Sequence, residues 1–143
     1  MESSGHTAET VAQAFLRAIN RQDPDRLSEL MSPTHRFIDS LGSVTEGREK
    51  MREAWNAYFR MVPDYAIAIE EYYPADALTG NDPVVIMLGV ASGTYTPDGH
   101  LDAKNRWKSP IAIRALIEDG LVSEWRVYAD NEPMRRLMVD KPL

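Results

Sequence analysis

The first half of the chain carries apolar residues at helical spacing. Across residues 7–22 they recur every three or four positions, so they share one face of an amphipathic helix. Asp23-Pro24 predicts a second, shorter helix, because aspartate caps helix N-termini and proline is tolerated at the first helical position. Residues 35–40 predict a short strand followed by a loop. Residues 47–62 show the strongest helical period in the sequence.

The second half changes to an alternation of period two, which is typical of half-buried strands. The strands predicted in this way cover residues 65–70, 84–95, 107–117 and 121–128. In the third of them the odd positions are mostly apolar and are predicted to face the core. In the last, Leu121, Trp125 and Val127 share one parity, and we expect them on the same face. Gly89 and Gly93 predict bulges or sharp bending of the sheet.

These elements predict one α+β domain over residues 1–143, with a flexible tail at residues 1–6. A loop is expected at residues 74–83 and a short closing helix at about residues 131–138. The order of elements places three helices on the concave face of a strongly curved, largely antiparallel sheet. Three helices do not fill the open end of such a sheet, so a pocket is expected there.

Composition excludes several classes of function. The 16 basic and 22 acidic residues give a net charge of −6, whereas a nucleic-acid-binding protein needs a basic surface. No apolar run approaches the ~20 residues needed to cross a membrane, and the first residues lack the features of a secretory signal. The chain has no cysteine, which fits a reducing compartment. We therefore expect a cytoplasmic protein that binds neither nucleic acid nor membranes.

Few residues are candidates for chemistry. No motif for phosphate binding, serine hydrolysis or zinc proteolysis occurs. His6, His35 and His100 have no metal-ligand spacing, so we expect no metal and no cofactor, and His35 is interpreted as a solvated histidine at a strand start. Asp39 remains, a carboxylate within a predicted strand. In an apolar cavity it would serve as a general base; the alternative is an exposed strand end or an Asx turn over residues 40–42.

Aromatic side chains and one inward isoleucine predict the walls of the pocket. Aromatic rings offer a flat apolar ligand a large contact area at low entropic cost, and ordinary core packing is the alternative for each of them. The predicted substrate-binding residues are Phe15, Phe37, Trp55, Tyr58, Phe59, Trp107, Ile113 and Trp125.

Several stretches resemble the nuclear-transport-factor-2-like superfamily, in its ketosteroid-isomerase and SnoaL-like polyketide-cyclase branch. They are residues 18–27, the strand Phe37-Ile-Asp39-Ser-Leu-Gly42 with Glu46-Gly47-Arg48 after it, residues 54–64 and residues 118–130. The resemblance covers nearly the whole chain. It implies a cystatin-like cone with a curved, mixed or antiparallel sheet.

For the site, the resemblance implies that Asp39 occupies the position of the ketosteroid-isomerase base. The tyrosine and the protonated aspartic acid that donate hydrogen bonds in that enzyme fall at Phe15 and near residues 112–113, which have no donor. The charged groups of limonene-epoxide-hydrolase-like relatives fall around residues 89–91 and at Val127, which carry no charge. The sequence therefore supports neither of these two specific reactions.

The leading hypothesis is a cofactor-independent isomerase, cyclase or lyase of the SnoaL-like type. In it, Asp39 acts as a general base on a small, largely apolar, cyclic ketone-type ligand, and Trp107 or Trp125 supplies an indole N–H to the ligand or to Asp39. The alternative is a non-catalytic ligand-binding or dimerisation domain of the same fold.

We also expect a homodimer. The outer parity of the predicted sheet is too apolar for a face that meets only water, and paired sheets are common in the family that the chain resembles. The apolar outer residues are Pro110, Ala112, Leu116 and Tyr128.

Overall fold

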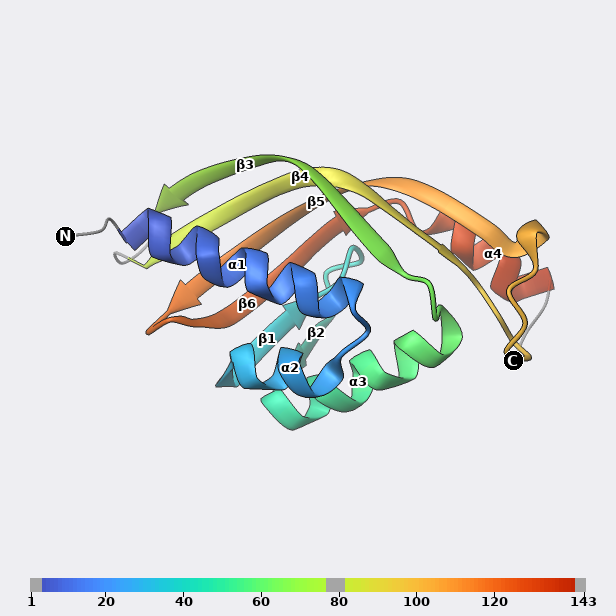
Figure 1. Cartoon of the computed structure of the whole chain (residues 1–143), viewed down its shortest axis with the longest axis horizontal. Helices are drawn as coiled ribbons and strands as arrows, with labels where there is room; N and C mark the ends of the chain where they lie inside the picture. The colour runs from blue at the N-terminus through green and yellow to red at the C-terminus, as the bar shows by residue number, and fades with distance from the viewer. Residues whose placement is uncertain (1–3, 77–81, 141–143) are drawn as a thin grey trace.

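The computed structural model describes residues 4–76 and 82–140, which form four α-helices, one short 3₁₀ turn and six strands (Figure 1). The first elements are α1 (Ser4–Asn20), α2 (Pro24–Leu30), β1 (Met31–Ile38) and β2 (Val44–Glu46). They are followed by α3 (Arg48–Met61), β3 (Ala66–Asp76) and β4 (Pro83–Thr94). The last are β5 (Arg106–Glu118), β6 (Leu121–Ala129) and α4 (Glu132–Asp140).

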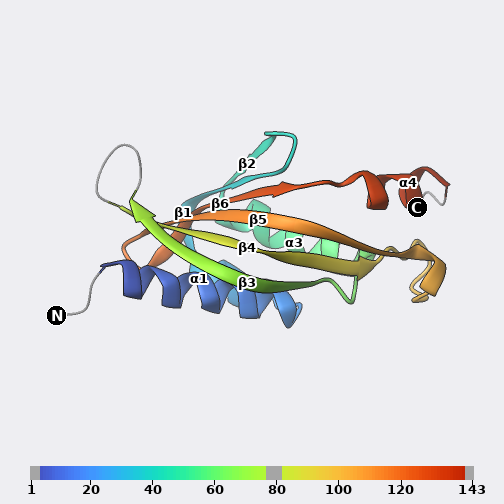
Figure 2. The ribbon, with the colours of Figure 1, turned by 90° about the horizontal axis from the view of Figure 1, so that it is seen from above.

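The strands form one curved, mixed sheet in the order β2-β1-β6-β5-β4-β3. β1 and β6 run parallel, and the other neighbouring pairs run antiparallel. The sheet arches over α1, α2 and α3, while α4 lies at the opposite end of the molecule from the start of α1 (Figures 1 and 2). The predicted α+β fold, with three helices on the concave face, is confirmed.

The core lies between these helices and the concave face. Ile111, Ile113 and Ile117 of β5 are buried, which confirms the predicted inward parity of that strand. Asp23 begins α2 as expected, because its Oδ1 accepts a hydrogen bond from the Arg26 N–H at 3.1 Å. Among the described residues, no helix is long and apolar enough to cross a membrane.

Several element boundaries differ from the sequence predictions. β1 begins at Met31, directly after α2, rather than at residue 35. The pattern does not predict β2, because three residues are too few to show an alternation. β3 extends to Asp76, so residues 74–76 of the predicted loop are strand, and residues 77–81 lie outside the described residues. α1 begins at Ser4, which makes residues 4–6 helical; residues 1–3 also lie outside the described part.

A bulge in β6 changes which of its residues face the core. Leu116 pairs with Glu124 but Ile117 pairs with Val122, so Ser123 is an extra residue in β6. Val122 is fully buried as a result, whereas Leu121 points to the other face. The prediction that Leu121 shares the face of Trp125 is wrong, because one inserted residue reverses the parity of a strand.

The bend predicted at Gly89 and Gly93 lies in the β3–β4 pair. The register shifts in β3 within residues 69–71, opposite Gly89. A Cβ atom at Gly89 would collide with the backbone carbonyl oxygen of Ala68, and one at Gly93 would collide with the side chain of Val62. Both positions exclude a side chain because neighbouring atoms approach the backbone closely.

Candidate functional site

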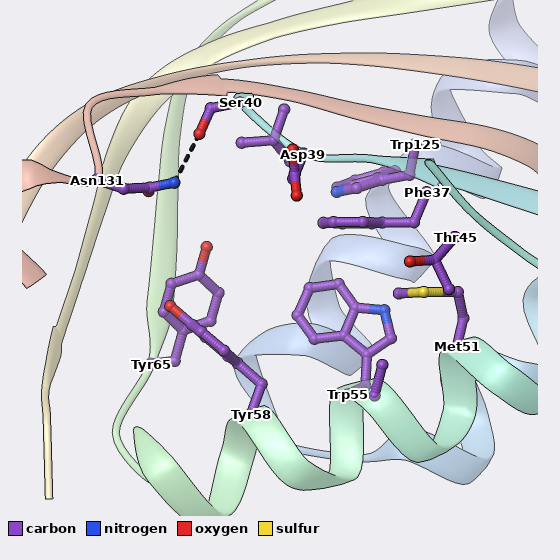
Figure 3. Close-up of a pocket in the computed structure, with 12 residues that line it drawn as sticks. Phe37, Asp39, Ser40, Thr45, Met51, Trp55, Tyr58, Tyr65, Trp125 and Asn131 are labelled. Atoms are coloured by element: carbon purple, nitrogen blue, oxygen red, sulfur yellow. Dashed lines mark hydrogen bonds between the residues drawn. The ribbon is translucent and has the colours of Figure 1, made fainter. Parts of the chain in front are cut away.

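A cavity of about 270 Å³ lies at the open end of the concave face, between α3 and the strands β1 and β6 (Figure 3). Its aromatic lining residues are Phe37, Trp55, Tyr58, Tyr65 and Trp125. Its polar lining residues are Asp39, Ser40, Thr45 and Asn131. Pockets for drug-sized ligands typically measure ~300–1,000 Å³, so this cavity fits a compact ligand.

Asp39 follows directly after β1, and its side chain points into the cavity (Figure 3). Its Oδ1 accepts hydrogen bonds from the backbone N–H groups of Leu41 and Ser43, each at 2.9 Å. This is the Asx turn that the sequence offered as a structural alternative. Within the described part of the chain, Oδ2 has no hydrogen-bond partner. One carboxylate oxygen therefore holds the loop, and the other is available to a ligand.

The aromatic walls stand nearly at right angles to one another. The ring planes of Phe37 and Trp55 meet at 82°, those of Trp55 and Tyr58 at 90°, and those of Tyr58 and Tyr65 at 87°. Trp125 lies beside Phe37, its partner across the parallel β1–β6 pair. Burial raises the pKa of both tyrosine hydroxyls far above the usual value, so both rings are neutral. The tyrosine part of the cavity wall is therefore uncharged.

Two contacts connect α4 and the residue that precedes it to the rim of the cavity. The Asn131 Nδ2 donates a hydrogen bond to the Ser40 Oγ at 2.6 Å, and the Tyr58 hydroxyl donates to the Met134 Sδ at 3.6 Å. A second cavity, of about 520 Å³, lies against α4 and shares Ser40, Tyr58 and Asn131 with the first. The rim is thus common to both cavities.

The first cavity carries little charge. Among the described residues that line it there is no lysine, arginine or histidine, and Asp39 is the one carboxylate. The described ranges also contain no cluster of three or more histidine, aspartate or glutamate side chains that could hold a metal ion.

The sequence profile of the SnoaL-like domain matches residues 12–125 of this chain. The chain belongs to the SnoaL-like family. The predicted membership of the nuclear-transport-factor-2-like superfamily is thereby confirmed. No curated protein sequence matches the chain.

Solved structures with the fold of this SnoaL-like domain have diverse descriptions. A SnoaL-like polyketide cyclase from Jannaschia sp. CCS1 is 16% identical, with 100% of this chain and 98% of that chain covered and a TM-score of 0.76. An LEH-like epoxide hydrolase from M. tuberculosis is 16% identical, with coverages of 97% and 89% and a TM-score of 0.76. A protein of ketosteroid isomerase-like fold from Catenulispora acidiphila, in complex with trimethylamine, is 18% identical, with coverages of 82% and 83% and a TM-score of 0.69. Identities this low establish a shared fold alone.

The SnoaL-like pocket brings together five of the nine residues predicted for the site. They are Phe37, Asp39, Trp55, Tyr58 and Trp125. The other four do not line the cavity: three of them are buried in the core, and Trp107 is half-buried beside Tyr65.

The structure places each of these four residues in the core or against a ring of the cavity wall. Phe15 is fully buried, with its ring centroid 4.5 Å from that of Trp125. Phe59 stacks on Trp55, with a centroid separation of 5.4 Å, and Trp107 lies 5.9 Å from Tyr65. Ile113 is 1% exposed in the core of the SnoaL-like domain.

His35 is buried rather than solvated, so that interpretation was wrong. Because β1 begins at Met31, His35 lies in mid-strand with its ring facing inward. Its Nδ1 lies 2.7 Å from the carbonyl oxygen of Val122 and is assigned as the N–H donor, and Nε2 has no partner within the described residues. Burial lowers the pKa of His35 to about 4, an effect that the hydrogen bond to Val122 partly opposes.

Sequence reasoning missed the remaining lining residues, which are Ser40, Thr45, Met51, Ala54, Tyr65, Val127 and Asn131. Tyr65 did carry a signal, since it shares the parity of the buried Ile67. Thr45 belongs to β2, which has no recognisable pattern. Asn131 lies between β6 and α4, next to Asp130, whose Oδ1 accepts a hydrogen bond from the Glu132 N–H at 2.9 Å.

Proposed function

We propose that this SnoaL-like domain is a cofactor-independent isomerase, cyclase or lyase for a compact, largely apolar, cyclic ketone-type molecule, with Asp39 as the general base. The observation that carries the proposal is the arrangement of the Asp39 carboxylate in the cavity wall. Two backbone N–H groups fix Oδ1, which leaves Oδ2 available to a ligand. A positioned general base typically contributes ~10²–10⁴-fold to a rate.

The proposed step is proton transfer. Asp39 Oδ2 removes a proton from the carbon next to the ligand's carbonyl group, and the electron pair of the broken C–H bond forms the enolate. Where a C=C bond of the ligand is conjugated with the enolate, the protonated Asp39 returns the proton to the far carbon of that bond as the double bond shifts, and otherwise it returns the proton to the same carbon, so no co-reactant is consumed. Trp125 faces Asp39 in Figure 3, and its buried Nε1 has no partner in the described ranges, so it is the proposed donor to the carbonyl oxygen or to Asp39.

Deuterium exchange tests this step without knowledge of the natural substrate. Exchange of the α-protons of cyclohexanone in D₂O, followed by NMR, is expected to be faster with the protein than in buffer. Asp39→Asn should lower the protein-dependent rate by at least ~10²-fold. It should keep the fold, because the asparagine amide oxygen can accept the same two N–H bonds. Glu53→Gln makes the same charge change at an exposed position of α3 and is the matched control. An unchanged rate in Asp39→Asn would falsify the role of Asp39.

A non-catalytic binding domain is the second candidate, favoured by the Asx turn that already occupies Asp39 Oδ1. The neighbour from Catenulispora acidiphila is in complex with trimethylamine, which supports a small ligand for a protein of this fold. Cyclohexanone binding with no exchange above buffer in the parent protein would favour this candidate over the enzyme.

We also propose a homodimer formed through the outer face of the sheet, and the cytoplasm as the compartment, which the lack of cysteine supports. On this face Tyr128 is 51% exposed and Leu88 is 36% exposed. Both pair across the sheet with Ala112, one of the apolar outer residues. Sedimentation at micromolar concentration should give about twice 16.2 kDa. Tyr128→Arg with Leu88→Glu should give the monomer, and a monomeric parent protein would contradict the proposal.

A further inference from the structure

The wall of the first cavity has a consistent electrostatic character. Phe37, Trp55, Tyr58 and Tyr65 meet successively at 82–90°, so the cavity is bounded by rings of different orientation. The described lining residues contribute one carboxylate, Asp39, and no cationic side chain. Aromatic faces carry the negative part of the ring quadrupole. In these edge-to-face contacts one ring presents its positive edge to the face of the next ring, so the preference of the cavity for positive charge comes first from the carboxylate, and a ring adds to it where its face is turned to the ligand.

Methylated ammonium groups match this environment better than other small ions. A cation within about 6 Å of a ring centroid is attracted to the ring face, and the attraction grows when water is excluded. Methyl groups on the nitrogen add apolar contact with the rings. An anion would meet the Asp39 carboxylate without a cationic partner, which is unfavourable in a partly buried site.

We propose that the ligand of this pocket carries a methylated ammonium group, which sits among Trp55, Tyr58 and Tyr65 with Asp39 as its counter-charge. This inference rests on the proposed function for the pocket and adds the charge of the ligand. The volume of about 270 Å³ restricts the ligand to a compact molecule.

A cationic ligand would also support the proposed proton transfer. In the proposed step Trp125 Nε1 is the hydrogen-bond donor assigned to the developing enolate, so a positive charge on the ligand would add to its stabilisation. A positive nitrogen close to the reacting carbon offsets the negative charge that remains when the proton moves to Asp39. The electron pair of the broken C–H bond stays in the ligand, so the step remains balanced.

Three probes of similar shape and different charge test the inference. Choline is the cation, 3,3-dimethylbutan-1-ol is its neutral isostere, and 3,3-dimethylbutanoate is the anion. The indole N–H signals in NMR report on binding, because Trp55 and Trp125 line the cavity and Trp107 does not. We expect choline to shift the first two signals and to bind about tenfold or more tightly than the alcohol, with the carboxylate weakest.

Variants separate the contributions of charge and aromatic surface. Asp39→Asn should weaken choline and leave the alcohol unchanged, while Glu53→Gln should change neither. Tyr58→Leu should reduce the preference for choline, whereas Tyr58→Phe keeps the ring and should retain it. If Tyr58→Leu fails to fold, the Asp39→Asn and Tyr58→Phe variants still test whether charge and aromatic surface determine the preference for choline.

The outcomes distinguish this inference from the proposed function. Equal or tighter binding of the neutral alcohol in the parent protein overturns the cationic ligand, whatever happens in the cyclohexanone exchange assay. A clear preference for choline supports it, even if exchange shows that Asp39 is not a general base.

Discussion

Alternate residues of β1 and of the loop after it face inward, and they meet a packed core at one end of the concave face and a cavity at the other. β1 directs His35 and Phe37 inward, and Asp39 follows them in the same parity. At the closed end, His35 is fully buried, and its ring lies 5.9 Å from that of Phe15 on α1. At the open end, Asp39 faces a cavity. His35 and Asp39 are only four residues apart. They thus have different surroundings, because different helices cover them.

Trp125 separates these two regions. At the closed end, Phe15 packs on the Trp125 ring with a centroid distance of 4.5 Å. At the open end, the Trp125 side chain lines the cavity. A change on one side of Trp125 should therefore mainly affect stability, and a change on the other side should mainly affect binding. Three predictions test this contrast.

The largest effect on stability is expected from acid at the closed end. The pKa of His35 is about 4 in the folded protein and about 6.5 when unfolded, so the unfolded state binds more protons between these values. The stabilisation is complete above pH 6.5 and is lost as the pH falls to about 4. We expect the free energy of unfolding to decrease by roughly 3 kcal/mol over this range, measured by urea denaturation.

Two histidine variants control for other titrating groups. His35→Gln should flatten the profile between pH 6.5 and 4, and His100→Gln, at an exposed position, should leave it as in the parent protein. Glu132 titrates in a lower window, since hydrogen bonds from Arg135 and Arg136 lower its pKa to about 2. A steep profile that survives in His35→Gln would refute the assignment to His35.

An intermediate effect is expected from Phe15→Tyr. The new hydroxyl enters a fully buried site behind Trp125 and should destabilise the fold by about 1–3 kcal/mol. Because Phe15 does not line the cavity, the variant should gain no 3-ketosteroid isomerisation, which we expect to be slow in the parent protein. Thermal unfolding and a steroid assay measure the two quantities. A gain in isomerisation would show that the side chain at position 15 reaches the cavity that holds Asp39.

The smallest effect is expected from Tyr58→Phe at the open end. It removes one long contact, from the hydroxyl to the Met134 Sδ at 3.6 Å, and keeps the aromatic ring. The free energy of unfolding should change by less than about 0.5 kcal/mol, as measured by urea denaturation. A loss comparable to that of Phe15→Tyr would show that the open end also depends on tight packing.

The fold was predictable because its elements have clear periods. The alternation in β5 gave the correct inward residues, and the parity of Phe37 was enough to place Asp39 at the cavity wall. The bulge at Ser123 was not predictable from alternation alone, since an extra residue looks like ordinary polar strand sequence. β2 was missed for lack of length.

The site was only half predictable, because parity tells which side of a sheet a residue faces but not which end of the sheet it occupies. Ile113 faces inward as expected, yet it lies under the helices and not at the opening. Thr45 and Asn131 reach the cavity from a short strand and a connection, where no period exists. Their positions follow from the curvature of the whole sheet.

The backbone contact at Gly89 has a consequence for how this sequence can vary. Any side chain at this position would collide with the Ala68 carbonyl oxygen, so glycine is the one residue that fits there. The neighbouring Leu88 is 36% exposed, so many replacements there should leave the fold intact. In a saturation-mutagenesis library of β4, position 89 should therefore remain glycine among the folded members, while position 88 diversifies.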